Sequence, residues 1–80
     1  MKWRGCKNIE FIWHGEWSDP ELRFKGHTID VWSIEDFCCD VMHEEGLNTD
    51  DDKVFNSWVR KHQELIEQTI IEYSQAKEES

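Results

Sequence analysis

Alternation of apolar and polar side chains near the start of the chain predicts a β-strand. Over residues 8–14, the apolar residues Ile9, Phe11 and Trp13 recur at every second position and would share one face. A period of two is typical of a strand with one buried side, and Gly15 marks its end. We therefore expect these three side chains, Trp13 included, to enter the core.

A hairpin is predicted after this strand. Residues 21–24 and 27–32 have strand-like patterns and flank Lys25-Gly26, a dipeptide that fits a two-residue turn with positive φ angles. The turn sets a register with two facing pairs: Leu22 with Ile29, and Phe24 with His27. Three such strands form a stable sheet only when another layer covers their apolar face.

The remaining sequence has helical periodicity. Ser33 is predicted to cap a first helix and Gly46 to end it. The apolar positions of this helix form one stripe: Ile34, Phe37, Cys38, Val41 and Met42. A second start signal has Thr49 as the cap and Asp52 closing a capping box. It begins a helix expected over residues 49–76, with a length of ~40 Å.

These elements predict one small α+β domain over residues 1–80, in which a three-stranded antiparallel sheet is followed by two helices (βββαα). The last helix would be longer than such a domain is wide, so its C-terminal half either projects or packs against a second copy. Residues 75–80 are polar and are expected to form a loose tail.

Acidic side chains dominate the second part of the sequence. Residues 1–30 hold five basic and five acidic side chains, whereas residues 31–80 hold four basic and thirteen acidic ones and carry the whole net charge of −9. Such a surface repels phosphates and anionic membranes, so we expect neither direct nucleic acid binding nor membrane binding. The sequence has no apolar run of ~20 residues and no signal peptide pattern, which favours a cytoplasmic protein.

Three cysteines and four histidines raise the question of a metal or catalytic site. Cys39 and His43 lie four residues apart, a spacing that can direct both side chains at one ion. Structural zinc sites normally contain close cysteine pairs such as C-x-x-C, which this sequence lacks. It also lacks a nucleophile elbow and a phosphate-binding glycine loop, so we expect no enzyme activity, no metal and no cofactor.

Clustered carboxylates are the main candidate site. Helix starts attract acidic residues, which accounts for Asp36 and for the triplet at 50–52. Asp40, Glu44 and Glu45 come late in their helix, where the helix dipole disfavours anions, so either solubility or partner binding favours them. With one tryptophan, the predicted partner-binding residues are Asp36, Asp40, Glu44, Glu45, Asp50, Asp51, Asp52 and Trp17.

The tryptophans divide into two groups by pattern. Trp58 follows the apolar stripe of its helix and is expected in the core, as Trp13 is in its strand. Trp3 and Trp17 lie outside the periodic segments, so they either contact a partner or cover the edge of the sheet.

In size, charge and aromatic content, and in residues 16–22 leading to the Lys25-Gly26 hairpin and residues 33–36, the chain resembles small accessory proteins of bacteriophages, including anti-CRISPR and anti-restriction inhibitors. The resemblance implies stoichiometric binding to a basic, nucleic-acid-binding surface of a host defence nuclease. The expected function is therefore that of a non-enzymatic acidic binding protein. The alternative is a homodimeric structural or regulatory module, paired through the C-terminal helix.

Overall fold

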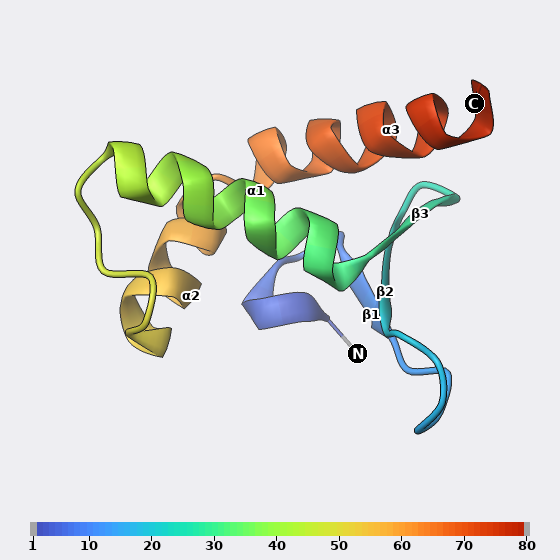
Figure 1. The fold of residues 1–80 in the computed structure, drawn as a ribbon, viewed down its shortest axis with the longest axis horizontal. Helices are drawn as coiled ribbons and strands as arrows, with labels where there is room; N and C mark the ends of the chain where they lie inside the picture. The colour runs from blue at the N-terminus through green and yellow to red at the C-terminus, as the bar shows by residue number, and fades with distance from the viewer. Residues whose placement is uncertain (1, 80) are drawn as a thin grey trace.

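The computed structural model describes residues 2–79, in which a small sheet packs with three α-helices (Figure 1). A 3-10 helix, η1 (Trp3–Gly5), precedes the strands. The strands are β1 (Glu10–Ile12), β2 (Glu21–Phe24) and β3 (His27–Asp30). The helices are α1 (Val31–Glu44), α2 (Asp52–Lys61) and α3 (Gln63–Glu79). The α+β class and the three-stranded antiparallel sheet are confirmed, whereas the predicted count of two helices is wrong.

The sheet has the order β1-β2-β3, and both neighbouring pairs are antiparallel. Lys25 and Gly26 have φ angles of 48° and 82°, so both central residues of the turn are left-handed, as a tight hairpin requires. The resulting register has the two predicted facing pairs: Leu22 with Ile29, and Phe24 with His27.

Strand β1 is shorter than its sequence pattern predicts. It ends at Ile12 opposite Glu21, and Pro20 has no N–H group with which to extend the ladder. Ile9 is fully buried just before the strand, but Trp13 lies beyond it with 61% of its surface exposed. The prediction that Trp13 is a core residue is therefore wrong. The alternating apolar pattern extends to residue 13, but the paired strand ends at Ile12.

The long helix predicted over residues 49–76 is two helices. His62, between α2 and α3, has φ −118° and ψ 32°, which is outside the helical region. The side chain of Gln63 joins this break to the N-terminal segment: its Oε1 accepts from the Lys7 backbone N–H (2.8 Å), and its Nε2 donates to the Arg60 carbonyl (3.0 Å). The break keeps the longest dimension of the molecule at 33 Å.

Helices α1 and α3 supply most of the layer that covers the sheet, since α3 contacts β2 and β3 while α1 contacts β3 and α3. The apolar side of α3 is thus used within the chain, with Ile66 and Ile70 fully buried. The helix continues to Glu79 through most of the segment 75–80 predicted to be loose, and Ser80 lies outside the described residues. The buried apolar core is Trp3, Cys6, Ile9, Leu22, Phe24, Ile29, Val31, Ile34, Cys38, Met42, Phe55, Trp58, Val59, Ile66 and Ile70.

Candidate partner-binding face

Helix α1 carries an exposed stripe that we call the α1 outer face. It consists of Trp32, Asp36, Asp40 and Glu44, which follow one another at intervals of four residues, with about 6 Å of helical rise between neighbours. All four side chains are exposed, while the other side of the helix enters the core. Among residues 2–76, whose side chains the structure describes, no ion pair involves the three carboxylates of this face. Their charge is therefore open to solvent or to a partner.

The start of α1 differs from the prediction, and the difference adds Trp32 to this face. Asp30 rather than Ser33 is the N-cap: its Oδ2 accepts from the Ser33 backbone N–H at 3.0 Å, and the Ser33 hydroxyl also donates to its carboxylate. The helix consequently begins at Val31, and Trp32 lies in its first turn instead of at the end of a strand. Sequence reasoning missed Trp32, although its spacing of four residues from Asp36 was a usable signal.

Exposed tryptophans gather at the end of the sheet where α1 begins. Trp17, in the β1–β2 loop, is 97% exposed, and Trp32 is 53% exposed. The indole Nε1 of Trp32 donates to Asp19 Oδ1 of this loop at 3.4 Å, and the Val31 backbone N–H donates to the Pro20 carbonyl at 3.1 Å. These contacts hold the loop that carries Trp17 beside the first turn of α1.

Trp3, for which the sequence left partner contact and cover of the sheet edge open, belongs to the core. It is 4% exposed, so it is no exposed contact. Trp58 is equally buried, as its helical stripe predicts. Exposure therefore separates Trp17 from Trp3, although sequence reasoning treated the two alike.

At the end of α1, the carboxylate of Glu45, one of the predicted partner-binding residues, bonds to a core residue instead. Gly46 ends the helix as predicted, with φ 78°, and its N–H donates to the His43 carbonyl at 3.1 Å. The preceding residue, Glu45, accepts from Trp58 Nε1 at 2.7 Å. Glu45 thus orients a core indole and is less available to a partner than Glu44.

The aspartate triplet lies in the α1–α2 loop and at the start of α2. Asp51, rather than Thr49, caps α2: its Oδ1 accepts from the backbone N–H groups of Lys53 (2.9 Å) and Val54 (3.4 Å). Asp50 and Asp52 are exposed on either side. This part of the predicted site therefore comes after the α1 outer face in the sequence. One of its three carboxylates, that of Asp51, serves as the helix cap.

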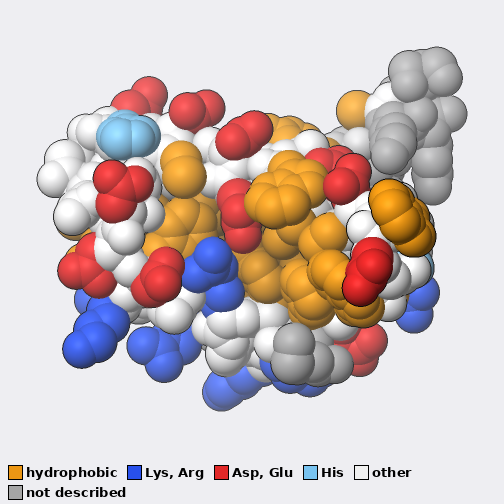
Figure 2. Space-filling model, turned by 60° about the horizontal axis from the view of Figure 1, so that its bottom comes forward, with side chains coloured by type: hydrophobic (Ala, Val, Ile, Leu, Met, Phe, Trp, Pro, Cys, Tyr) orange, Lys and Arg blue, Asp and Glu red, His pale blue; other side chains and the backbone are white. Residues whose placement is uncertain are grey.

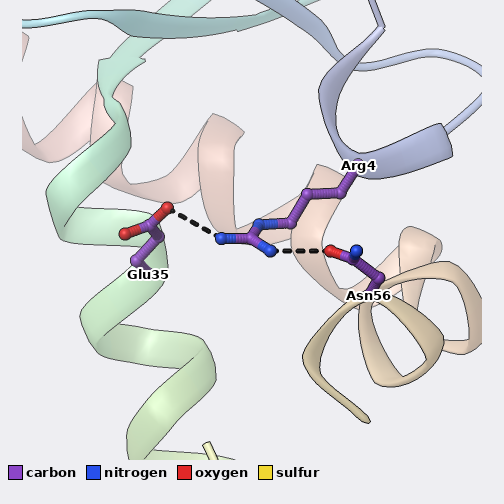
Figure 3. Close-up of polar contacts among 3 residues, drawn as sticks. All are labelled: Arg4, Glu35 and Asn56. Carbon is purple, nitrogen blue, oxygen red and sulfur yellow. Dashed lines mark hydrogen bonds and ion pairs between the residues drawn. The ribbon is translucent and has the colours of Figure 1, made fainter. Parts of the chain in front are cut away.

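Arg4 joins three helices and removes Glu35 from the exposed acidic surface (Figure 3). Its Nη1 donates to Asn56 Oδ1 at 2.6 Å, its Nη2 pairs with Glu35 Oε1 at 3.3 Å, and its guanidinium lies 4.3 Å from the centre of the Phe55 ring. The residue adopts φ 47°, an uncommon conformation for a non-glycine residue. Nothing in the local sequence indicates this role, because Asn56, Glu35 and Phe55 all lie more than thirty residues away.

The cysteines are free and poorly suited to nucleophilic chemistry. Burial raises the pKa of the Cys6 thiol to about 11 and that of Cys38 to about 12. Partial burial, followed by the charges of Asp36 and Glu35, also raises the pKa of Cys39. A thiol held neutral is a weak nucleophile. Among the side chains that the structure describes, those of residues 2–76, no group of three His, Cys, Asp or Glu could hold a metal ion, so Cys39 and His43 gain no third ligand there.

Charges of opposite sign occupy different parts of the face drawn in Figure 2. Hydrophobic side chains gather in its middle, most Asp and Glu side chains lie above and to the left, and Lys and Arg lie mainly along the lower edge. A segregated arrangement of this kind produces a directional field that can attract and orient a charged partner.

Comparison with known proteins gives no relative: no protein-family model, no curated protein and no solved structure matches this chain. In the part of the chain that the structure describes, no helix has the length and apolar character needed to cross a bilayer.

Proposed function

We propose that this protein is a non-enzymatic binding protein whose α1 outer face docks on a basic surface of a partner protein. The observation that carries the proposal is the row formed by Asp36, Asp40 and Glu44, which is exposed and has no ion-pair partner among the described residues. A basic surface would neutralise the row, and the charge pattern would speed the encounter.

Exposed tryptophans at one end of the row supply what carboxylates lack, since large aromatic side chains contribute strongly to interface affinity. Trp32 lies in the first turn of α1, and the loop that carries Trp17 is bonded to this turn through Asp19 and Pro20, so a partner seated on the acidic row could also contact this loop. The partner class follows from the resemblance to bacteriophage inhibitors: a nucleic-acid-binding surface of a defence nuclease, occupied in competition with its substrate. Homodimerisation through α3 is the alternative, and light scattering that finds a monomer would remove it.

Affinity capture with a matched pair of variants tests the proposal. The wild-type chain, Asp36→Asn/Asp40→Asn and the control Glu64→Gln/Glu72→Gln are immobilised, and each captured protein is purified and titrated by calorimetry. Both variants lose the same charge, but only the first alters the α1 outer face. We expect the first to weaken binding at least about tenfold and to flatten its salt dependence, with the control near wild type. Equal losses in the two variants, or none in either, would refute the docking face.

Trp17→Ala separates the aromatic part of the face from the acidic part. Because Trp17 makes almost no contact within the chain, the variant should retain its folding stability. It should nevertheless weaken partner binding about thirtyfold, the loss of a typical interface anchor. Unchanged affinity would remove Trp17 from the site and leave the carboxylates.

A further inference from the structure

A second candidate site lies where the α1–α2 loop meets α2, next to the C-terminal end of the α1 outer face. A cavity of about 450 Å³ opens there, within the size range of small-molecule sites. Its lining is mainly apolar and includes both charged and aromatic side chains: Glu45, Leu47, Lys53, Val54, Ser57, Trp58, Lys61 and His62. None of the predicted functional residues except Glu45 takes part in it.

Two stacked rings form a fixed wall of this cavity. The rings of Trp58 and His62 lie 4.3 Å apart between centres and 17° from parallel. Trp58 Nε1 donates to Glu45 at 2.7 Å, and His62 Nδ1–H donates to the Trp58 carbonyl oxygen at 2.8 Å, so both rings are held by hydrogen bonds. Because Trp58 is buried and stacked against His62, the half-buried His62 ring, with Leu47 and Val54 in the same lining, offers most of the preformed surface to a flat group.

The rim of the cavity is cationic, in contrast to the chain as a whole. Lys53, Ser57 and Lys61 follow one another at intervals of four residues on one face of α2, which puts one lysine about a turn before the Ser57 hydroxyl and the other about a turn after it. Both lysines are exposed, and neither forms an ion pair with a described residue. The one acidic lining residue, Glu45, already accepts the indole N–H. Although the chain has a net charge of −9, this apolar cavity is edged by two unpaired lysines, and they favour an anion at this place.

We propose that this cavity binds a small aromatic carboxylate. Its ring would pack against His62, which is backed by the buried Trp58, and its carboxylate would lie between Lys53 and Lys61, within reach of the Ser57 hydroxyl. The basic partner proposed for the α1 outer face is unsuited to this cavity, since its charge would be repelled by the rim. Anion binding in this cavity is therefore independent of partner binding by the α1 outer face, and its test can fail without affecting that proposal.

The test compares two ligands of nearly equal shape, 2-naphthoate and the uncharged 2-naphthamide, by amide and indole N–H chemical shifts. Naphthoate is expected to shift resonances of residues 45–47 and 53–62, and to bind about tenfold more tightly than the amide, the combined effect of two exposed lysine contacts. Shifts centred elsewhere, or no saturable shift up to about 5 mM naphthoate, would overturn the proposal. Equal binding of the two ligands would also overturn it, and would assign the cavity to an uncharged group such as an apolar side chain of a partner.

Variants locate the source of the preference. Lys53→Gln/Lys61→Gln should bind naphthoate and naphthamide equally, whereas the control Lys2→Gln/Lys25→Gln, which removes the same charge elsewhere, should keep the tenfold preference. Ser57→Trp, which fills the cavity, should lose both ligands. Spectral dispersion establishes that each variant is folded. A preference that survives in Lys53→Gln/Lys61→Gln would show that the rim is not the anion site.

Discussion

Asp40→Asn should make the isolated protein more stable, because Asp40 lies in the middle of the acidic row on α1. It has a carboxylate four residues before it and another four residues after it, at Asp36 and Glu44. Like charges at this spacing on a helix repel each other. Asparagine has nearly the same shape and helix propensity as aspartate, so the substitution removes the charge and little else.

The size of the gain can be worked out from the spacing. Each like-charged pair costs about 0.2–0.5 kcal/mol, so losing two pairs should add about 0.4–1 kcal/mol to the free energy of unfolding. For a domain of this length, that corresponds to a rise in Tm of about 4 °C. Asp36→Asn removes only one such pair, since the residue four positions before it is Trp32, and should give about half the gain.

Thermal unfolding followed by circular dichroism at low salt and at about 1 M NaCl measures the effect, since the higher salt reduces the screening length to about 3 Å and should abolish the gain. Glu16→Gln, an exposed residue in the β1–β2 loop, controls for the general benefit of lowering the net charge. A gain equal to that of the control, or one that persists at high salt, would show that the carboxylates on α1 do not act as a repelling row.

Three further outcomes follow from the core. Arg4→Lys should lower the free energy of unfolding in urea by about 2 kcal/mol, because lysine cannot donate to two partners while stacking on Phe55; equal midpoints would contradict this. At pH 8, iodoacetamide should modify Cys39 before the other two cysteines, and it should modify Cys6 about a hundredfold more slowly than an ordinary thiol. Mass spectrometry measures both rates, and equal rates for Cys39 and Cys6 would refute the burial argument. Stability should fall above pH 9, because the unfolded chain releases thiol protons that folded Cys6 and Cys38 retain, at a slope of up to about 1.4 kcal/mol per pH unit for each thiol. Urea midpoints for Cys38→Ala should show the shallower slope, and an unchanged slope would exclude that thiol.

The hairpin and the apolar stripe of α1 could be predicted from the sequence because both depend on neighbours in the chain. Lys25-Gly26 determines the turn, and the turn determines which residues face each other across β2 and β3. On α1, Ile34, Cys38 and Met42 are fully buried, as their helical spacing predicts.

Predictions failed where distant segments meet. The break at His62 has no glycine or proline to announce it, and Gln63 binds Lys7, which is 56 residues away. Trp3 is buried in a 3-10 helix whose arginine bonds to α1 and α2. Such contacts leave no periodic signal, so the pattern did not assign Trp3 to the core and predicted one helix through residue 62.

For the candidate site, the sequence indicated which side chains carry charge, but the structure was needed to group them. Asp36, Asp40 and Glu44 share a helix, so their common face follows from spacing. Trp32 joins them only because Asp30 starts the helix three residues before the predicted cap. Glu45 and Asp51 differ from their acidic neighbours in having hydrogen bonds that only the fold provides.

Asp30 is both the last residue of β3 and the cap of α1, so no linker separates the sheet from the helix. The orientation of α1 is therefore fixed by backbone geometry at one residue and cannot swing on a flexible joint. A partner therefore binds a row of carboxylates that is already ordered, so complex formation costs this protein little conformational entropy. Inserting two glycines after Asp30 would loosen this junction and test how far rigidity contributes to affinity.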